Sequence, residues 1–201
     1  MILFPAFLKL AGRRCLVVGA GPVAEEKIEG LLRAGAEVRV VAPEATRRIR
    51  ELARKRKIRW DERVFRAPDL GGALLAVAAT SSPSLHARIY RLAQRRGVLC
   101  NVVDDPEHCD FYYGSVVRRG ELQIAISTGG HSPALAQRLR KEMEKKFGAE
   151  YKEWLKELGK IRKRLFAKKV TPERRRALLH GLASEASFQE FLGRKQRKSR
   201  V

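Results

Sequence analysis

The chain has 201 residues, 44% of them hydrophobic, which is enough for one full domain and a smaller second one. Lysine and arginine number 43 against 22 acidic residues, and the net charge of +21 attracts anions, although solvated basic helix faces give the same excess. No apolar run reaches the ~18–20 residues of a membrane span. Residues 1–10 lack the basic start of a secretory signal. We therefore expect a cytoplasmic protein with no membrane partner.

The first predicted element is a strand over residues 15–18, which a glycine turn and the start of a helix follow. Gly19 permits the tight turn, Gly21 lets the backbone approach a pyrophosphate, and Ala24, in place of a third glycine, still allows close packing of helix against strand. Pro22 suits the first helical turn, whose free N–H groups favour an anion. The sequence therefore predicts a dinucleotide site, although similar turns occur in α/β domains that bind nothing.

Strands and helices then alternate, which predicts a parallel, doubly wound sheet of the Rossmann type. The helix after the glycine turn ends near Gly35. The further predicted elements are strands over residues 37–42, 58–64, 73–79 and 98–103 and helices over residues 44–57 and 83–97. We assign residues 1–113 to this NAD-binding domain.

Beyond this domain the pattern changes. Two short strands, residues 115–117 and 122–126, form a predicted hairpin, and a helix follows it. We assign residues 114–148 to a dimerisation region, because a two-stranded unit is too small to stand alone and must pack on the first domain or on a second copy. Residues 149–201 form a predicted helical domain, and from residue 193 we expect a frayed basic tail.

Three cysteines, Cys15, Cys100 and Cys109, lack the spacing of a metal site and cannot all pair with one another. Cys15 and Cys100 fall in strand-like runs, so we interpret them as small buried hydrophobic residues. Free thiols are typical of a reducing cytoplasm.

Polar residues follow the predicted strands at the edge where ligands of open parallel sheets bind. Thr80 offers a hydroxyl group to a ribose or a nicotinamide, and we count Asn101, in the last strand, and Ala24 among the predicted cofactor-binding residues. Asp104 and Asp105 place carboxylates where a substrate would meet the cofactor. A plain Asp-Pro turn is the alternative for this pair.

The second strand ends at Pro43, with Glu44 just beyond it and no arginine at the strand end itself, although Arg47 and Arg48 follow soon after. An acidic residue in this place hydrogen-bonds the ribose of NAD, so the sequence favours NAD over NADP as the cofactor.

The segment between the predicted hairpin and the helix that follows it combines two glycines, hydroxyl groups and a helix N-terminus, as an anion cradle does. We predict that it binds the substrate through Ser127, Thr128, Gly129, Gly130, His131 and Ser132. An ordinary helix start with Ser132 as N-cap is the alternative, and a lone loop histidine such as His131 is more often incidental.

Five motifs in collinear order are GAGPVAEEK at 19–27, VVAP at 40–43, AAT at 78–80, CNVVDDP at 100–106 and STGGHSP at 127–133. Over about residues 5–147 the chain thereby resembles the precorrin-2 dehydrogenase family, the amino-terminal module of siroheme synthase. The resemblance implies oxidation of precorrin-2 to sirohydrochlorin, with hydride passed to NAD, by a homodimer whose second domains interlock. It also implies an acid–base role for Asp104 and cofactor contacts at Gly19, Gly21, Pro22, Val23, Pro43, Glu44 and Thr80.

Some family members also insert Fe²⁺ into sirohydrochlorin, so a bifunctional dehydrogenase and ferrochelatase remains an alternative. Precorrin-2 carries a rim of carboxylates, which a basic crevice would steer and hold. A basic nucleic-acid-binding module with a vestigial nucleotide pocket is the remote alternative, because no aromatic-and-basic binding motif accompanies the charge.

Overall fold

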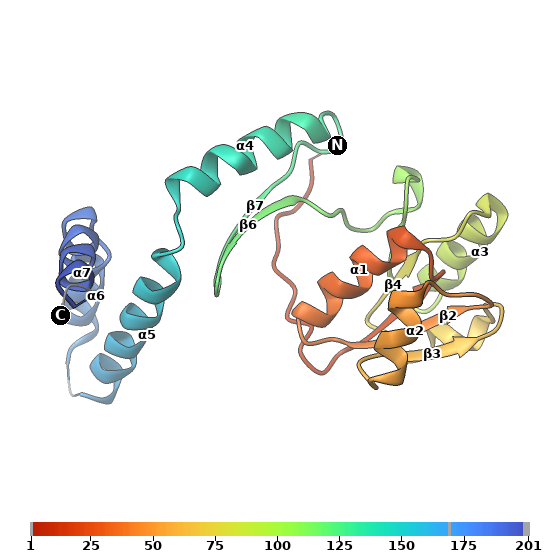
Figure 1. Cartoon of the computed structure of the whole chain (residues 1–201), viewed down its shortest axis with the longest axis horizontal. Helices are drawn as coiled ribbons and strands as arrows, with labels where there is room; N and C mark the ends of the chain where they lie inside the picture. Colours follow the sequence, from red (N-terminus) through yellow and green to blue (C-terminus); the bar gives the residue numbers. More distant parts are fainter. Residues whose placement is uncertain (1, 169, 199–201) are drawn as a thin grey trace. The chain divides into compact units, whose positions relative to one another are not determined.

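The computed structural model describes residues 2–168 and 170–198. The chain divides into two compact units, Met1–Tyr113 and Gly114–Val201. Figure 1 labels most of the helices and strands of both units. Within the described residues, no helix is both long enough and apolar enough to cross a lipid bilayer.

A five-stranded parallel sheet forms the centre of the first unit, in the spatial order β3-β2-β1-β4-β5. Its strands are β1 (Arg14–Val18), β2 (Glu37–Ala42), β3 (Arg59–Glu62), β4 (Leu75–Ala78) and β5 (Leu99–Val102). The chain runs outward from β1 to β3 and then starts again on the other side of β1 with β4. This order confirms the predicted Rossmann-type sheet and places its switch point between β1 and β4.

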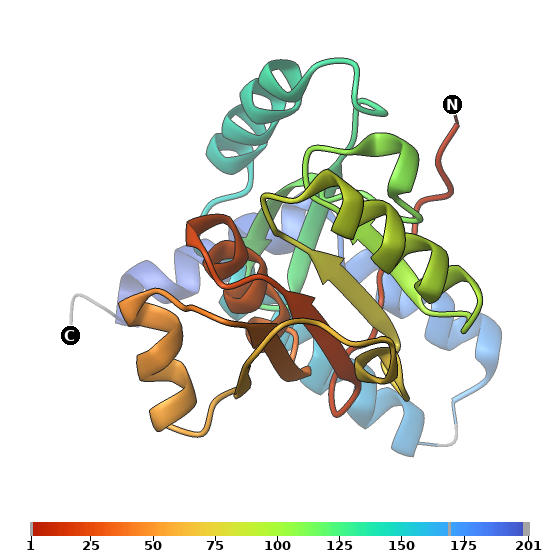
Figure 2. The same cartoon turned by 90° about the vertical axis from the view of Figure 1, so that its right-hand side faces the viewer.

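Helices cover both faces of the sheet. They are α1 (Pro22–Arg33), α2 (Arg47–Arg54) and α3 (Pro83–Gln94), with short 3₁₀ turns η1 (Ala67–Leu70) and η2 (Pro106–His108). The first two helices pack on one face and α3 on the other, as the red and orange helices and the yellow-green helix of Figure 2 show. Residues 15–18 of β1 are therefore at most 2% exposed, as expected of a strand that is covered on both faces.

The second helix is shorter than the predicted span of residues 44–57. It starts after Thr46, whose hydroxyl group accepts a hydrogen bond from the N–H of Ile49 at 3.3 Å. It ends before Arg56, which adopts a left-handed conformation with a φ of 53°. Local backbone features at both ends thus make α2 shorter than the helix that the apolar spacing predicted.

The second unit begins with an antiparallel pair of strands, β6 (Ser115–Arg119) and β7 (Leu122–Ile126). Four helices follow, α4 (Pro133–Lys146), α5 (Tyr151–Ala167), α6 (Pro172–Leu182) and α7 (Glu185–Lys198). The predicted hairpin and helical region are both present in the structure.

The expectation of a frayed tail from residue 193 is wrong as far as Lys198, because α7 continues to that residue. Phe188 is 5% exposed, and its ring centroid lies 4.5 Å from that of Tyr151 and 4.7 Å from that of Trp154 on α5. This aromatic contact anchors the helix, and the polar end of α7 continues from it. Residues 199–201 lie outside the described part of the chain.

Candidate functional site

A cavity of about 580 Å³ opens at the carboxyl ends of β1, β2 and β4. Its lining brings together the predicted cofactor residues Gly19, Gly21, Pro22, Val23, Pro43, Glu44 and Thr80. Ligands of open α/β sheets bind at this edge and at this switch point. The cavity is therefore our candidate for the dinucleotide site.

Gly19 holds the backbone of the loop against the neighbouring strand. Its φ is 104°, and its N–H donates a hydrogen bond to the carbonyl of Val41 at 3.0 Å. A Cβ atom at this position would lie 2.1 Å from the carbonyl oxygen of Ala79. Only glycine fits here, because both the backbone conformation and the close approach exclude a side chain.

The amino terminus of α1 has free backbone donors. Gly21 is the N-cap residue and provides no side-chain cap, whereas hydroxyl groups cap α2 and α3. The N–H of Glu25 donates to the Gly21 carbonyl at 3.1 Å, but within the described ranges the N–H groups of Val23 and Ala24 have no partner. The donor of Val23 lines the cavity and, with the helix dipole, fits a pyrophosphate.

Space in front of Gly21 supports the same fit. An added Cβ at Gly21 would meet no atom within 4 Å, and its φ of −82° is open to any residue. The absence of a side chain at this position thus leaves room for a ligand rather than for another part of the protein.

Two further residues that the sequence assigned to the cofactor lie outside the cavity lining. Ala24 is 0% exposed and packs into the core from the buried face of α1. Asn101 is 6% exposed, and its side-chain amide donates a hydrogen bond to the carbonyl of Phe111 at 2.8 Å. Both residues hold the scaffold of the site; a direct contact with the cofactor stays a prediction.

A second hollow of about 370 Å³ adjoins the first one and contains Asp104. The two cavities share four lining residues, Val23, Ala79, Thr80 and Ser81. The glycine loop and Asp104 therefore lie at the same edge of the sheet, on the two sides of Thr80. The hollow also includes His86 from α3, which the sequence reasoning missed, because its burial depends on where the helix packs.

The two neighbouring carboxylates of the hollow have different surroundings. Asp105 accepts a hydrogen bond from Nδ1 of His108 at 2.7 Å. Asp104 is exposed, has a φ of 59°, and makes no side-chain hydrogen bond or ion pair within residues 2–168 and 170–198. Asp104 is therefore the carboxylate of the pair that is free to exchange a proton with a ligand.

The buried thiols play no part in this chemistry. Burial raises the pKa of Cys15 to about 11 and that of Cys100 to about 12. Both thiols are free and 1% or less exposed, which confirms their interpretation as small hydrophobic residues.

The predicted substrate loop lies in the second unit, between β7 and α4. The hydroxyl group of Thr128 accepts from the N–H of Ser132 at 3.2 Å, and Ser132 in turn caps α4 by accepting from the N–H of Leu135. Ser127 accepts from the N–H of Gly129 at 3.2 Å. These bonds fold the loop upon itself and account for its hydroxyl groups without a ligand.

The remaining residues of that loop are open. Gly129 and Gly130 have positive φ angles of 61° and 86°, and His131 is exposed. A role of residues 127–132 in substrate binding stays a prediction.

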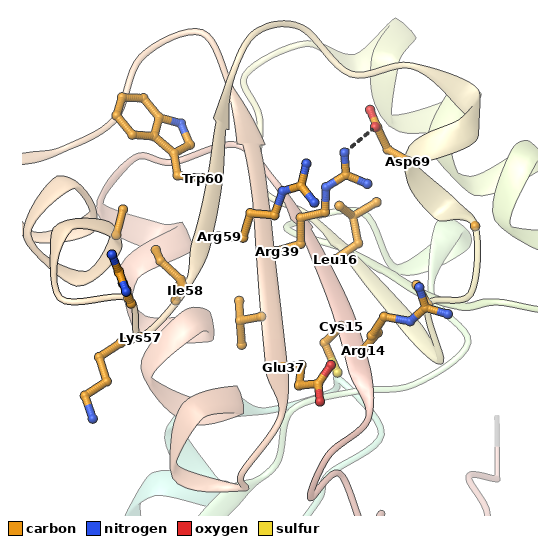
Figure 3. Close-up of a pocket in the computed structure, with 15 residues that line it drawn as sticks. Arg14, Cys15, Leu16, Glu37, Arg39, Lys57, Ile58, Arg59, Trp60 and Asp69 are labelled. Atoms are coloured by element: carbon orange, nitrogen blue, oxygen red, sulfur yellow. Dashed lines mark hydrogen bonds and ion pairs between the residues drawn. The ribbon is translucent and has the colours of Figure 1, made fainter.

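A larger cavity, of about 710 Å³, lies at the opposite, amino ends of β1, β2 and β3 (Figure 3). One of its lining residues, Asp69, pairs with Arg39 at 3.1 Å and with Arg63 at 2.6 Å. The hydrogen bond from Arg63 lowers the pKa of Asp69, which is 5% exposed. We interpret this network as structural, and its position at the amino edge separates it from the dinucleotide site.

Comparisons with known proteins agree with this geometry. Residues 6–115 match the family described as "Putative NAD(P)-binding", and residues 119–146 match the family described as "Sirohaem biosynthesis protein central". Siroheme synthase of Nitrosococcus oceani is 39% identical over 178 residues, which are 83% of this chain and 38% of that protein. The siroheme synthase of Methylococcus capsulatus is 38% identical over 98% of this chain and 42% of that protein.

The chain belongs to the precorrin-2 dehydrogenase and siroheme synthase amino-terminal module family. The resemblance in the sequence is thereby confirmed, and the family binds a nicotinamide dinucleotide. The chain spans about two fifths of the length of the curated siroheme synthases that it matches.

A solved family member agrees over the whole chain. The structure described as "SirC, precorrin-2 dehydrogenase" covers 97% of this chain and 100% of its own, with a TM-score of 0.77 and 26% identity. The family fold thus extends through both units and includes the helices after the hairpin.

We expect the same substitution to affect stability at Gly19 and ligand binding at Gly21. Gly19→Ala should lower the free energy of unfolding by about 3 kcal/mol, because the methyl group collides with the Ala79 carbonyl. Gly21→Ala should keep wild-type stability but weaken NAD binding about tenfold, because its methyl group enters the space for the ligand. Urea unfolding and NAD titration measure the two effects. Equal NAD affinity of Gly21→Ala and wild type would contradict the assignment of the site.

Proposed function

We propose that this chain oxidises precorrin-2 to sirohydrochlorin and passes the hydride to NAD. The observation that carries the proposal is the pair of adjoining cavities, which brings the free amides of α1 and the free carboxylate of Asp104 to the two sides of Thr80. The match with a solved precorrin-2 dehydrogenase supports it. Family membership and this site favour the enzyme over the nucleic-acid-binding alternative, and the solved dehydrogenase gives no support to additional iron insertion.

The residues of the first cavity would hold the cofactor along the sheet edge. The free N–H group of Val23 would bind the pyrophosphate, and Glu44 would accept a hydrogen bond from the adenosine ribose. The nicotinamide half would then extend past Thr80. When bound, the dinucleotide supplies the hydride acceptor.

Asp104 would take the proton that accompanies hydride loss. Oxidation of precorrin-2 removes two electrons and one proton as hydride, and a second proton must leave the macrocycle. A carboxylate without a protein partner can accept that proton and release it to solvent. The acidic neighbour Asp105 is hydrogen-bonded to His108, so we assign the two carboxylates separate roles.

Positive charge would hold the substrate. Precorrin-2 carries several acetate and propionate groups, and the net charge of +21 steers such a polyanion to the protein. We retain residues 127–132 as the proposed substrate loop, with exposed His131 as its free side chain.

NAD is the proposed cofactor in preference to NADP. Glu44 lines the cavity just beyond β2, where a carboxylate favours a ribose hydroxyl group and repels a phosphate. Nearby Arg48 forms ion pairs with Glu29 at 3.3 Å and with Glu51 at 3.8 Å, so its charge is already compensated.

A homodimer is the proposed assembly. The sheet β6–β7 packs on α4, but its outer edges have no further strand partner within the described residues. Helix α4 is incompletely covered within one chain, since Leu135 is 39% exposed and Ala136 is the only described residue of the helix that is buried. A second copy would cover both features.

Asp104→Asn should bind NAD like the wild type and lose about 100-fold in turnover of precorrin-2, because asparagine tolerates the same left-handed backbone but accepts no proton. Asp105→Asn is the matched control, since its carboxylate lines the same hollow and is paired with His108. It should retain most of the turnover. Equal losses in the two variants, or none in Asp104→Asn, would disprove the role of Asp104.

Titration with both dinucleotides tests the choice of cofactor. The wild-type chain should bind NAD more tightly than NADP, and Glu44→Ser should reduce this preference, because the carboxylate that repels a 2′-phosphate is removed. Tighter binding of NADP by the wild type would reverse the choice.

Sedimentation of the purified chain tests the assembly. The expected mass is twice that of one 22.7 kDa chain at micromolar concentration. Leu135→Lys on the exposed face of α4 should shift the mass toward one chain, because a buried charge without a partner opposes association. A wild-type chain that sediments as a monomer would contradict the proposal.

A further inference from the structure

His86 is a buried polar side chain that the mechanism has not used. It is 8% exposed, and its Nε2 atom is buried without a hydrogen-bond partner in the described part of the chain. Buried polar atoms nearly always have partners, and one without a partner destabilises the fold. An apolar side chain would fill the same place without this cost, so the imidazole requires another explanation.

The position of the ring points to a ligand. His86 lines the hollow that contains Asp104 and adjoins the glycine-loop cavity across Thr80. The backbone holds it firmly, since its N–H donates to the carbonyl of Ser82 at 3.1 Å in the first turn of α3. On the same helix, Ile89 is 0% exposed in the core. The ring is thus fixed beside the hollow by a well-packed helix.

The positions of the lining residues along the sheet edge indicate which half of the dinucleotide reaches the hollow. Glu44 lies at the β2 end, where the adenosine ribose would bind, and the free amides of α1 lie in the middle. The other half of the dinucleotide must therefore extend past Thr80 into the hollow of Asp104 and His86.

The chemistry of that half matches an imidazole. A nicotinamide carries one carboxamide, which has an NH₂ donor and a carbonyl acceptor. A neutral imidazole also offers one donor and one acceptor nitrogen. A hydrogen bond with the carboxamide would give the imidazole a polar partner and would fix the rotation of the nicotinamide ring.

We propose that His86 is a cofactor-positioning residue that hydrogen-bonds the nicotinamide carboxamide and so orients the ring toward the substrate beside Asp104. The inference rests on the proposed function, since it requires a nicotinamide dinucleotide in the glycine-loop cavity. It assigns a residue on α3 to the orientation of the reacting ring, whereas α1 binds the phosphates.

The test compares NAD with two analogues in which the carboxamide is altered. In the 3-acetylpyridine analogue a methyl group replaces NH₂, and in the thionicotinamide analogue sulfur replaces the carbonyl oxygen. The wild-type chain should bind at least one analogue about tenfold more weakly than NAD, because one hydrogen bond is lost. His86→Leu should bind NAD as weakly as that analogue and should not discriminate between them, whereas His86→Asn should recover part of the discrimination.

Thermal unfolding without cofactor separates this role from a structural one. His86→Leu should unfold at the same temperature as the wild type or higher, because it removes a buried polar atom that has no partner. Ile89→Val is the control for a packing defect in α3. It should lower the unfolding temperature and leave the discrimination between NAD and the analogues unchanged.

The outcomes distinguish the two proposals. Normal NAD binding with wild-type discrimination in His86→Leu, or no discrimination by the wild type, would overturn the role of His86 alone. A lower unfolding temperature of His86→Leu with unchanged discrimination would show that the residue is structural. A wild-type chain that binds no NAD would overturn the proposed function and this inference with it.

Discussion

The close approach of Gly19 to the carbonyl of Ala79 is the contact on which the site depends. It brings the end of β1 against the end of β4 at the switch point of the sheet, so that α1 starts directly beside Thr80. Because no side chain fits between the two strands, the free amides of α1 and the hollow of Asp104 become parts of one crevice. A cofactor held by one part then presents its reactive end to the other.

The two ends of this crevice differ in the groups that they offer to a ligand. The proposed phosphate-binding end offers a backbone donor at a helix terminus, which needs no charged side chain and whose geometry the helix fixes. The proposed reacting end contains two carboxylates: Asp105 is hydrogen-bonded to His108, and Asp104 has no such partner in the described residues. The larger cavity at the amino edge includes an ion-pair network around Asp69 at the other end of the sheet, so cavity size alone does not identify the site.

Much of this arrangement could be predicted from the sequence, because it is encoded locally. Strand β2 agrees at both ends with the prediction, since its apolar run lies between Gly35 and Pro43. The edge position of Asp104 followed from strand order alone. The sequence could not show that Phe188 packs on α5 and so anchors a helix in the basic tail, nor that His86 is buried, because both depend on packing between elements distant in the chain.

A crystal structure of the chain with NAD bound tests the central claim most directly, since that claim concerns one continuous crevice. The account predicts the pyrophosphate on the amide of Val23 and the nicotinamide ring beyond Thr80, beside Asp104. A nicotinamide ring outside the Asp104 hollow, or a dinucleotide bound at the amino edge of the sheet, would contradict it.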